Sequence, residues 1–275
     1  MSKKVEEIYA FPPIPGKVMN LGSRAVTESL NMGFPYTNPK GLFGNDFWYC
    51  ISPLVSPKDD EDRLYNLVCK YIDQYNALND EQRQMVKLRP NGRYLACEYS
   101  QNIDKSINEL RTTQKQVLEL LGGKIGLADL IDYCKATGAA DKDTDQDSIA
   151  YDFKKLRRLF IQSKLIVLNG GYSSKSSVEP LNLLNDIASK SEGLIAVNPD
   201  TKNRNHVGET GRIVLHIDEG DVSVPYISIV STSGLSSPVN VSAYKGKYMK
   251  KSAESPRDFK RRIWLGEITE KLQSK

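Results

Sequence analysis

The stretch from Ser148 to Tyr172 combines basic and aromatic side chains at helical spacing. It reads SIAYDFKKLRRLFIQSKLIVLNGGY. Residues three and four apart share one face of a helix, so this segment has an apolar face, formed by Ile149, Phe153, Leu156 and Phe160. The opposite face is basic and predicted to be exposed. Its cations suit contacts with phosphate, and its aromatic ring suits a base or sugar contact. The residues predicted to bind nucleic acid here are Tyr151, Lys154, Lys155, Arg157 and Arg158.

A second basic cluster occupies the C-terminal end of the chain. From residue 245 onward, ten lysines and arginines accompany four acidic residues, so this segment carries more positive charge than the net +4 of the whole chain. Aromatic residues are interleaved with these cations, a pattern typical of single-strand binding, where rings stack on bases. The alternative is a solvated basic tail whose aromatic residues pack against the sheet. The predicted contact residues are Lys245, Lys247, Lys250, Lys251, Lys260, Arg261 and Arg262.

The sequence contains none of the motifs that mark common enzyme chemistries. It has no Gly-x-x-x-x-Gly-Lys-Ser/Thr loop, no His-Glu-x-x-His and no Gly-x-Ser-x-Gly. The small-residue segments 170–177 and 208–212 could accept a phosphate, but ordinary turns have the same composition. The only histidines are His206 and His216, which leaves general acid–base catalysis to carboxylates. We therefore predict that the protein is not an enzyme.

The four cysteines indicate neither a metal site nor a disulfide framework. Cys50, Cys69, Cys97 and Cys134 are far apart and form no Cys-x-x-Cys pair. The sequence begins with Met1-Ser2-Lys3-Lys4-Val5-Glu6-Glu7, and no secretory or membrane-spanning apolar run is expected. We predict reduced thiols in a cytoplasmic protein, with no metal, no cofactor and no membrane span.

The N-terminal third is predicted to be poor in regular structure. Prolines and glycines are dense between residues 11 and 41, which favours an extended arm or packed loops. Residues 47–51 and 94–99 have the composition of short strands. Between them a helix is predicted from Ser56, with an apolar stripe of Leu64, Leu67, Val68, Tyr71 and Tyr75.

Three helices and a strand are predicted in the centre of the chain. The apolar spacing gives helices over 107–121, 127–137 and 148–162, with Gly122 and Gly138 after the first two. A strand over 165–168 then runs into an Asn-Gly-Gly turn. This order of elements is that of a helix-turn-helix core followed by the start of a wing.

These segments resemble the N-terminal winged helix of DeoR-type bacterial repressors. The resemblance rests on QKQVLELL, LADLIDYCKATG, SIAYDFKKL and LIVLNGG, and it covers about sixty residues. It implies a compact DNA-binding module. The sequence differs from the family in the acidic turn 141–147 and in Ala150 and Tyr151, which stand where arginines are usual. It also lacks the strand–helix alternation of the family's sugar-phosphate-binding domain.

The last third is predicted to be rich in antiparallel strands. A helix over 180–190 precedes four apolar, β-branched segments separated by turn residues, at 194–197, 212–217, 222–230 and 239–244. With 39% hydrophobic and 26% charged residues, the 275-residue chain has the composition of a globular protein.

Together these patterns predict an α+β protein with three regions. They are an N-terminal arm and α/β region (1–105) that is irregular and Pro-rich, a central three-helix winged-helix-like segment (106–178), and a C-terminal antiparallel β-rich part with a basic tail (179–275). The predicted function is non-enzymatic binding of DNA or RNA in transcription, replication or genome packaging. Two alternatives remain open: a self-assembling structural protein, such as a viral nucleocapsid, matrix or shell component, and a winged-helix protein-docking adaptor.

Overall fold

A mixed six-stranded sheet forms the centre of the molecule. The computed structural model describes residues 4–42, 45–99, 103–138, 143–170, 178–200, 207–232, 247–248 and 253–274. The sheet order is β3-β2-β6-β9-β8-β7, in which the first four strands are parallel and the last two antiparallel. The strands are β2 (Val18–Gly22), β3 (Ile125–Asp129), β6 (Leu165–Asn169), β7 (Ile195–Pro199), β8 (Thr210–Ile217) and β9 (Gly220–Ile229).

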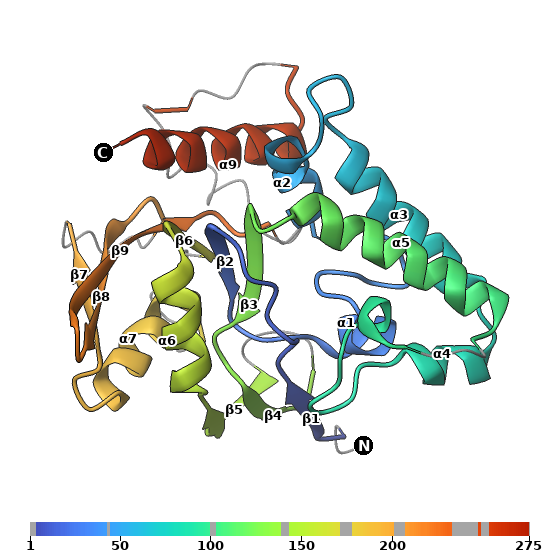
Figure 1. The fold of residues 1–275 in the computed structure, drawn as a ribbon, viewed down its shortest axis with the longest axis horizontal. Coiled ribbons are helices and arrows are strands. Elements are labelled where there is room, and N and C mark those ends of the chain that lie inside the picture. Colours follow the sequence, from blue (N-terminus) through green and yellow to red (C-terminus); the bar gives the residue numbers. More distant parts are fainter. Residues whose placement is uncertain are drawn as a thin grey trace.

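Burial on both faces explains the composition of the central strands. The Leu-Ile-Val-Leu run of β6 is fully buried, as expected of a parallel strand covered on both sides. In Figure 1 the sheet lies between α9 (Pro256–Gln273), above it, and α6 (Phe153–Gln162) and α7 (Pro180–Lys190), below it. The remaining helices are α1 (Thr27–Met32), α2 (Phe47–Val55), α3 (Arg63–Asn76), α4 (Asp80–Val86), the short 3-10 helix η1 (Leu95–Cys97) and α5 (Lys105–Leu121).

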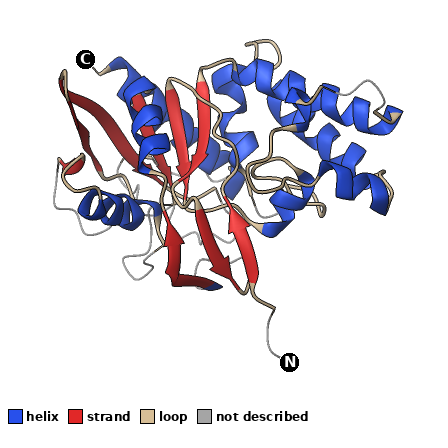
Figure 2. Cartoon of the chain, turned by 60° about the horizontal axis from the view of Figure 1, so that its bottom comes forward, coloured by secondary structure: helices blue, strands red, loops and turns tan. Residues whose placement is uncertain are grey.

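A second, smaller sheet has three antiparallel strands. Its order is β1-β4-β5, formed by β1 (Glu6–Tyr9), β4 (Tyr133–Ala136) and β5 (Thr144–Ala150). Figure 2 shows it below the main sheet, on the side of the N-terminus. Strands β4 and β5 belong to the connection from β3 to β6, so this sheet is built into a crossover of the main one.

The winged-helix prediction is wrong. Residues 127–137, expected to be its second helix, form the end of β3, a turn and β4. Residues 144–150, expected to include the start of its third helix, form β5, and the predicted wing strand is β6 in the middle of the main sheet. The apolar residues between 127 and 134 are all buried as predicted, but two short buried strands can have the same apolar spacing as one helix.

Other predictions of secondary structure had mixed outcomes. Helices over 107–121 and 180–190, and the apolar stripe of the helix after Ser56, are confirmed as α5, α7 and α3. Strands at 194–197, 212–217 and 222–230 are confirmed as the antiparallel group β7-β8-β9, which joins the main sheet, whereas 239–244 lies outside the described residues. The strand predicted at 47–51 is helix α2, and the one at 94–99 contains η1. The Pro-rich N-terminal region contains β1, β2 and α1, so it is more regular than expected.

The structure confirms a mixed arrangement of helices and sheets. Strands from all three predicted regions share the main sheet, since β2 comes from the first, β3 and β6 from the second, and β7 to β9 from the third. The division into three domains stays a prediction. No described helix is long and apolar enough to cross a membrane.

The position of β6 gives a direct test of this fold. Leu168 is fully buried in β6, so Leu168→Ala is expected to lower the free energy of unfolding by about 3 kcal/mol through lost burial and a residual cavity. Leu194, just before β7, is 44% exposed. Leu194→Ala should therefore change the free energy of unfolding by only about 0.5 kcal/mol. Urea denaturation of both variants measures the difference. Equal, small effects would place residues 165–168 at the surface, as a wing strand would be.

Candidate functional site

The carboxyl ends of β2 and β6 mark the point where the chain changes direction in the sheet. From β2 the chain continues to β3 on one side of β2, and from β3 it returns to β6 on the other side of β2. In open α/β sheets, ligands bind at such a switch point, in the crevice outside the carboxyl ends of the strands. The side chains at this edge are therefore the first candidates for a functional site.

Three polar side chains from distant parts of the sequence meet at the ends of β2 and β6. Asn20, in β2, is only 2% exposed, and its Nδ2 donates to the Tyr36 hydroxyl at 2.9 Å. Asn169, the last residue of β6, is the second side-chain amide that hydrogen-bonds Tyr36. Burial raises the pKa of Tyr36 above its ordinary value of 10, while the two amides act in the opposite direction. The phenol therefore stays protonated at neutral pH.

The backbone of Tyr36 adopts an uncommon conformation. Its φ is +55°, in the left-handed region that bulky side chains seldom adopt. Such strain persists where the surroundings fix the residue firmly, and it is concentrated at functional sites. Here it accompanies a ring held by stacking: the Tyr36 and Phe47 rings lie 4.2 Å apart with an interplanar angle of 26°.

Asp129 and Gly22 complete the edge on the side of β3. A Cβ on Gly22 would lie 2.7 Å from the Tyr36 hydroxyl and 3.3 Å from Asp129 Oδ1, so both polar groups face the same small space. Only glycine fits at this position, because any Cβ would collide with the Tyr36 hydroxyl. The backbone N–H of Phe11 donates to Asp129 Oδ2 at 3.3 Å. Burial raises the pKa of Asp129 to about 6 against the opposing effects of that hydrogen bond and of Lys155.

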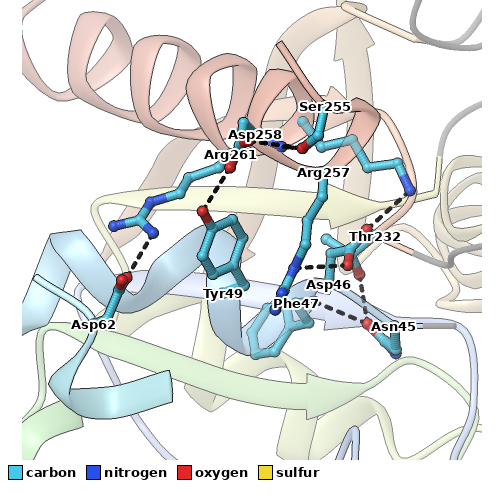
Figure 3. Close-up of polar contacts among 11 residues, drawn as sticks. Asn45, Asp46, Phe47, Tyr49, Asp62, Thr232, Ser255, Arg257, Asp258 and Arg261 are labelled. Atoms are coloured by element: carbon cyan, nitrogen blue, oxygen red, sulfur yellow. Dashed lines mark hydrogen bonds and ion pairs between the residues drawn. The ribbon is translucent and has the colours of Figure 1, made fainter. Parts of the chain in front are cut away.

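The opposite side of the edge is a chain of hydrogen bonds through Thr232, just after β9. Asn169 Nδ2 donates to Thr232 Oγ1 at 3.1 Å, and the Thr232 N–H donates back to Asn169 Oδ1 at 3.2 Å. Thr232 Oγ1 also donates to Asn45 Oδ1 at 3.0 Å. Asn45 Oδ1 in turn accepts from the Phe47 N–H (Figure 3). The start of α2 is thus tied to the ends of β6 and β9.

The acceptor oxygen of Asn20 is the least satisfied group at this edge. Asn20 Oδ1 is buried and has no hydrogen-bond partner among the described residues. A buried acceptor without a donor costs about 1–3 kcal/mol, so such groups are uncommon unless something else fills the role. A ligand N–H or an ordered water would supply the donor.

The arrangement suits recognition of a small planar ring with polar edges. It offers side-chain amides, a protonated phenol and an aromatic stack at a buried sheet edge, and polar groups of these kinds fix the orientation of ligands in small-molecule sites. A metal site does not follow: within the described ranges, no cluster of three or more His, Cys, Asp or Glu residues could hold an ion. Asp129 is the acidic group of the edge, and a carboxyl with a pKa near 6 can both accept and donate a proton near neutral pH.

The cations and the tyrosine predicted to bind nucleic acid around α6 have different surroundings. Lys154 and Arg158 are exposed and Arg157 is half-buried. Lys155 is buried, with its Nζ 2.6 Å from Asp132 Oδ1, so its predicted place on an exposed face is wrong. The predicted groove-facing Tyr151 is half-buried and donates to Asp186 Oδ2 at 2.6 Å. The helix begins only at Phe153, so Ile149 and Tyr151 lie before it and belong to neither of its faces.

The described residues of the C-terminal cluster that were predicted to contact nucleic acid, namely Lys247, Lys260, Arg261 and Arg262, form ion pairs within the protein. Lys247 contacts Glu267 and Glu270, and Arg262 contacts Glu254. Lys260 contacts Asp46, and Arg261 contacts Asp62. Lys245, Lys250 and Lys251 lie outside the described residues. Nucleic-acid binding by the predicted residues of both clusters stays a prediction.

Sequence reasoning missed the residues that gather at the sheet edge, namely Asn20, Tyr36, Asn45, Asp129, Asn169 and Thr232. The sequence pattern assigns Asn169 only to an Asn-Gly-Gly turn, and it assigns the segment that contains Tyr36 only to irregular, Pro- and Gly-rich structure. A usable signal did exist, because Asn20 and Asn169 each interrupt or end a short apolar run. A polar residue at the end of a buried parallel strand is a candidate for a site.

Comparison with known proteins adds one solved structure. No protein-family model and no curated protein matches the sequence. A solution NMR structure described as a "putative Uracil DNA glycosylase" from Methanosarcina acetivorans matches 95% of this chain and 98% of its own, at 16% identity and a TM-score of 0.37. A likeness this low supports no assignment of fold or activity.

Two predictions are nevertheless corrected by this comparison. The matching structure is described as a glycosylase and not as a DeoR-type domain, which agrees with the loss of the winged helix from the fold. The same description names an enzyme, which is contrary to the predicted non-enzymatic protein. The alternative of a winged-helix adaptor loses its basis with the winged helix. The alternative of a structural shell protein finds no support in the comparison.

The raised pKa of Asp129 predicts a pH-dependent stability. Its folded pKa of about 6 exceeds its ordinary value of 3.8, so the folded state binds the proton more tightly and the wild-type protein loses stability as pH rises from 4 to 6. Asp129→Asn keeps an acceptor for the Phe11 N–H and removes this titration. The variant should gain about 2–3 kcal/mol relative to wild type between pH 4 and pH 7.

Urea denaturation of both proteins at pH 4, 5, 6 and 7 measures this difference. Parallel stability curves would mean that Asp129 titrates normally and is not desolvated by the site.

Proposed function

We propose that this protein is an enzyme that binds a nucleobase at the carboxyl edge of its parallel strands and hydrolyses the bond that attaches the base to its sugar. The observation that supports this most directly is the buried, unpartnered Asn20 Oδ1 beside the Tyr36 hydroxyl. A nucleobase carries N–H and C=O groups side by side on a flat ring. It can donate to Asn20 while its face lies against an aromatic surface.

Tyr36 is suited to contact the oxygen of such a ring. Its phenol oxygen interacts with the side-chain amides of Asn20 and Asn169, both of which lower the pKa of the phenol. That effect is expected of donors to the oxygen, and it leaves the hydroxyl proton for a third partner. A base carbonyl can accept it, and a fixed donor at this point stabilises negative charge that develops on a departing base.

Asp129 is the proposed general base. It lies at the same edge as Tyr36, and its pKa of about 6 allows it to be ionised at neutral pH yet basic enough to take a proton from water. The water attacks the sugar carbon, the bond to the base breaks, and the base leaves with the bonding electrons. Asn20 and Tyr36 hold the base during this step.

A nucleic acid is the proposed carrier of the base. The exposed Lys154 and Arg158 offer positive charge on α6, and phosphate contacts by such residues give a steep loss of affinity with salt. The description of the Methanosarcina protein names uracil and DNA, so oligonucleotides with a single uracil are the first substrates to test.

Removing the Asn20 side chain should abolish most of the activity. We expect Asn20→Ala to lower the rate of uracil release from single-stranded or duplex oligonucleotides by about a hundredfold, since a donor–acceptor contact to the reacting group is lost. Asn66→Ala, on the exposed face of α3, is the matched control and should keep the wild-type rate. Free uracil measured by chromatography is the readout, with a salt series to detect phosphate contacts.

Two results would contradict the proposal. One is release of no base by the wild-type protein together with no binding of any free nucleobase in calorimetric titration. The other is an equal rate in the Asn20→Ala and Asn66→Ala variants, which would place the reaction away from this edge.

A further inference from the structure

Asp46 joins the candidate site to the C-terminal helix. It stands between Asn45 and Phe47, both of which belong to the hydrogen-bonded edge described above. Its backbone N–H donates to the Thr232 carbonyl at 2.7 Å, which ties residue 46 to the end of β9. Its side chain points the other way, toward α9 (Figure 3).

Two cations of α9 hold the Asp46 carboxylate. Lys260 Nζ lies 3.1 Å from Oδ2, and Arg257 Nε lies 3.2 Å from Oδ1. The Lys260 side chain is only 4% exposed and that of Asp46 only 14% exposed, so both charges are withdrawn from water. Loss of Lys260 would leave the buried carboxylate with Arg257 as its cationic partner, whose side chain is 36% exposed, and a buried charge that loses its buried partner is destabilising.

The carboxylate contact restricts the orientation of the whole 45–47 segment. The backbone of residue 46 is fixed to Thr232 on one side and its side chain to α9 on the other. Asn45 Oδ1 is thereby placed to accept from Thr232 Oγ1, which in turn accepts from Asn169. A displacement of Asp46 would be passed along this chain of hydrogen bonds to Asn169 and Tyr36.

The neighbouring cation Arg261 performs a different task, although it lies on the same helix. Its guanidinium contacts Asp62 Oδ1 at 2.6 Å and stacks 4.4 Å from the centre of the Tyr49 ring. Among the described residues, neither the Tyr49 nor the Asp62 side chain is hydrogen-bonded to residues 45–47 or to Thr232, since the Tyr49 hydroxyl donates to Asp258. Arg261 therefore anchors α9 to the body of the protein without a direct link to the site.

We propose that Lys260 is a positioning residue for the candidate site. Through Asp46 it sets the orientation of Asn45, Thr232 and Asn169, and so the affinity of the edge for a nucleobase. The identity of the ligand in this inference rests on the proposed function. The structural coupling between α9 and the side-chain amides does not depend on it.

The test compares two substitutions of equal kind on the same helix. Lys260→Met and Arg261→Met each replace a long cation by a long neutral side chain and each weaken the attachment of α9. NMR without ligand records the backbone amide resonances of Asn45, Asn169 and Thr232 and the side-chain amide resonances of the two asparagines. Calorimetry measures binding of free uracil, which serves as the probe. Thermal unfolding gives the stability of each variant.

A third protein separates position from stability. The double variant Asp46→Asn with Lys260→Met removes both charges, so no uncompensated carboxylate remains and the fold should recover most of the lost stability. Without the carboxylate, neither residue 260 nor Arg257 can form an ion pair with residue 46, so no ion pair directs residue 46 toward α9. We therefore expect the double variant to fold yet keep the altered amide resonances.

The expected result is specific to Lys260. Lys260→Met and the double variant shift the Asn169 and Thr232 resonances and weaken uracil binding by about tenfold or more, since small misplacements of a site have effects of this size or larger. Arg261→Met does neither, although it also lowers the unfolding temperature.

Three outcomes decide between the claims. Unshifted amides in the Lys260 variants, or equal losses of binding in Lys260→Met and Arg261→Met, would overturn the positioning role. If the wild-type protein binds no nucleobase while the amides still shift in the Lys260 variants alone, the proposed function fails and the positioning role stands.

Discussion

The parallel pairing of β2 with both β3 and β6 is the constraint on which the rest of the structure depends. It puts a strand from the N-terminal region between two strands that lie more than a hundred residues later in the sequence. Because the strands are parallel, their carboxyl ends meet at one edge. Asn20, Gly22, Asp129 and Asn169 become neighbours only through this register, and the Pro- and Gly-rich segment after β2 brings Tyr36 to the same place.

Close approach at this edge explains several otherwise unfavourable features together. Gly22 has no side chain where the Tyr36 hydroxyl and Asp129 converge, and Tyr36 adopts a positive φ. Asp129 keeps a carboxyl in a buried position that raises its pKa, and Asn20 keeps an acceptor without a donor. Each feature lowers stability when considered alone. Their concentration at the switch point is the pattern expected of a site that is completed by a ligand.

The C-terminal helix closes the edge from above by means of charge and aromatic contacts. Trp264 of α9 is fully buried and donates to the Val230 carbonyl at the end of β9, while its ring meets Phe47 edge-on. The described C-terminal basic residues that were predicted to form a nucleic-acid surface form ion pairs with acidic residues of the same chain, as Lys260 does with Asp46 and Arg261 with Asp62. Clusters of charge in a sequence do not reveal whether their partners lie in another molecule or in the same chain.

Sequence reasoning predicted the elements that are long and periodic and missed those that are short and buried. Helices α3, α5 and α7 and the β-branched strands β7 to β9 have strong local patterns, which is why they were identified. Strand β2 has only five residues and contains Asn20, so nothing local distinguishes it from a loop. The helical spacing from Leu127 to Cys134 arose from two strands, because strand pairing overrode the local pattern. The polar residues Asn20 and Asn169 in short apolar runs are visible in the sequence, but their meeting with Tyr36 and Asp129 could not be predicted, since that same pairing brings these residues together.

A crystal structure of the protein with free uracil would test the central claim most directly. The account predicts a flat ring at the carboxyl edge of β2 and β6, with a ring N–H within hydrogen-bond distance of Asn20 Oδ1 and a carbonyl facing the Tyr36 hydroxyl. A ring bound elsewhere, or Asn20 Oδ1 bonded to another group of the protein while the edge stays closed, would contradict it.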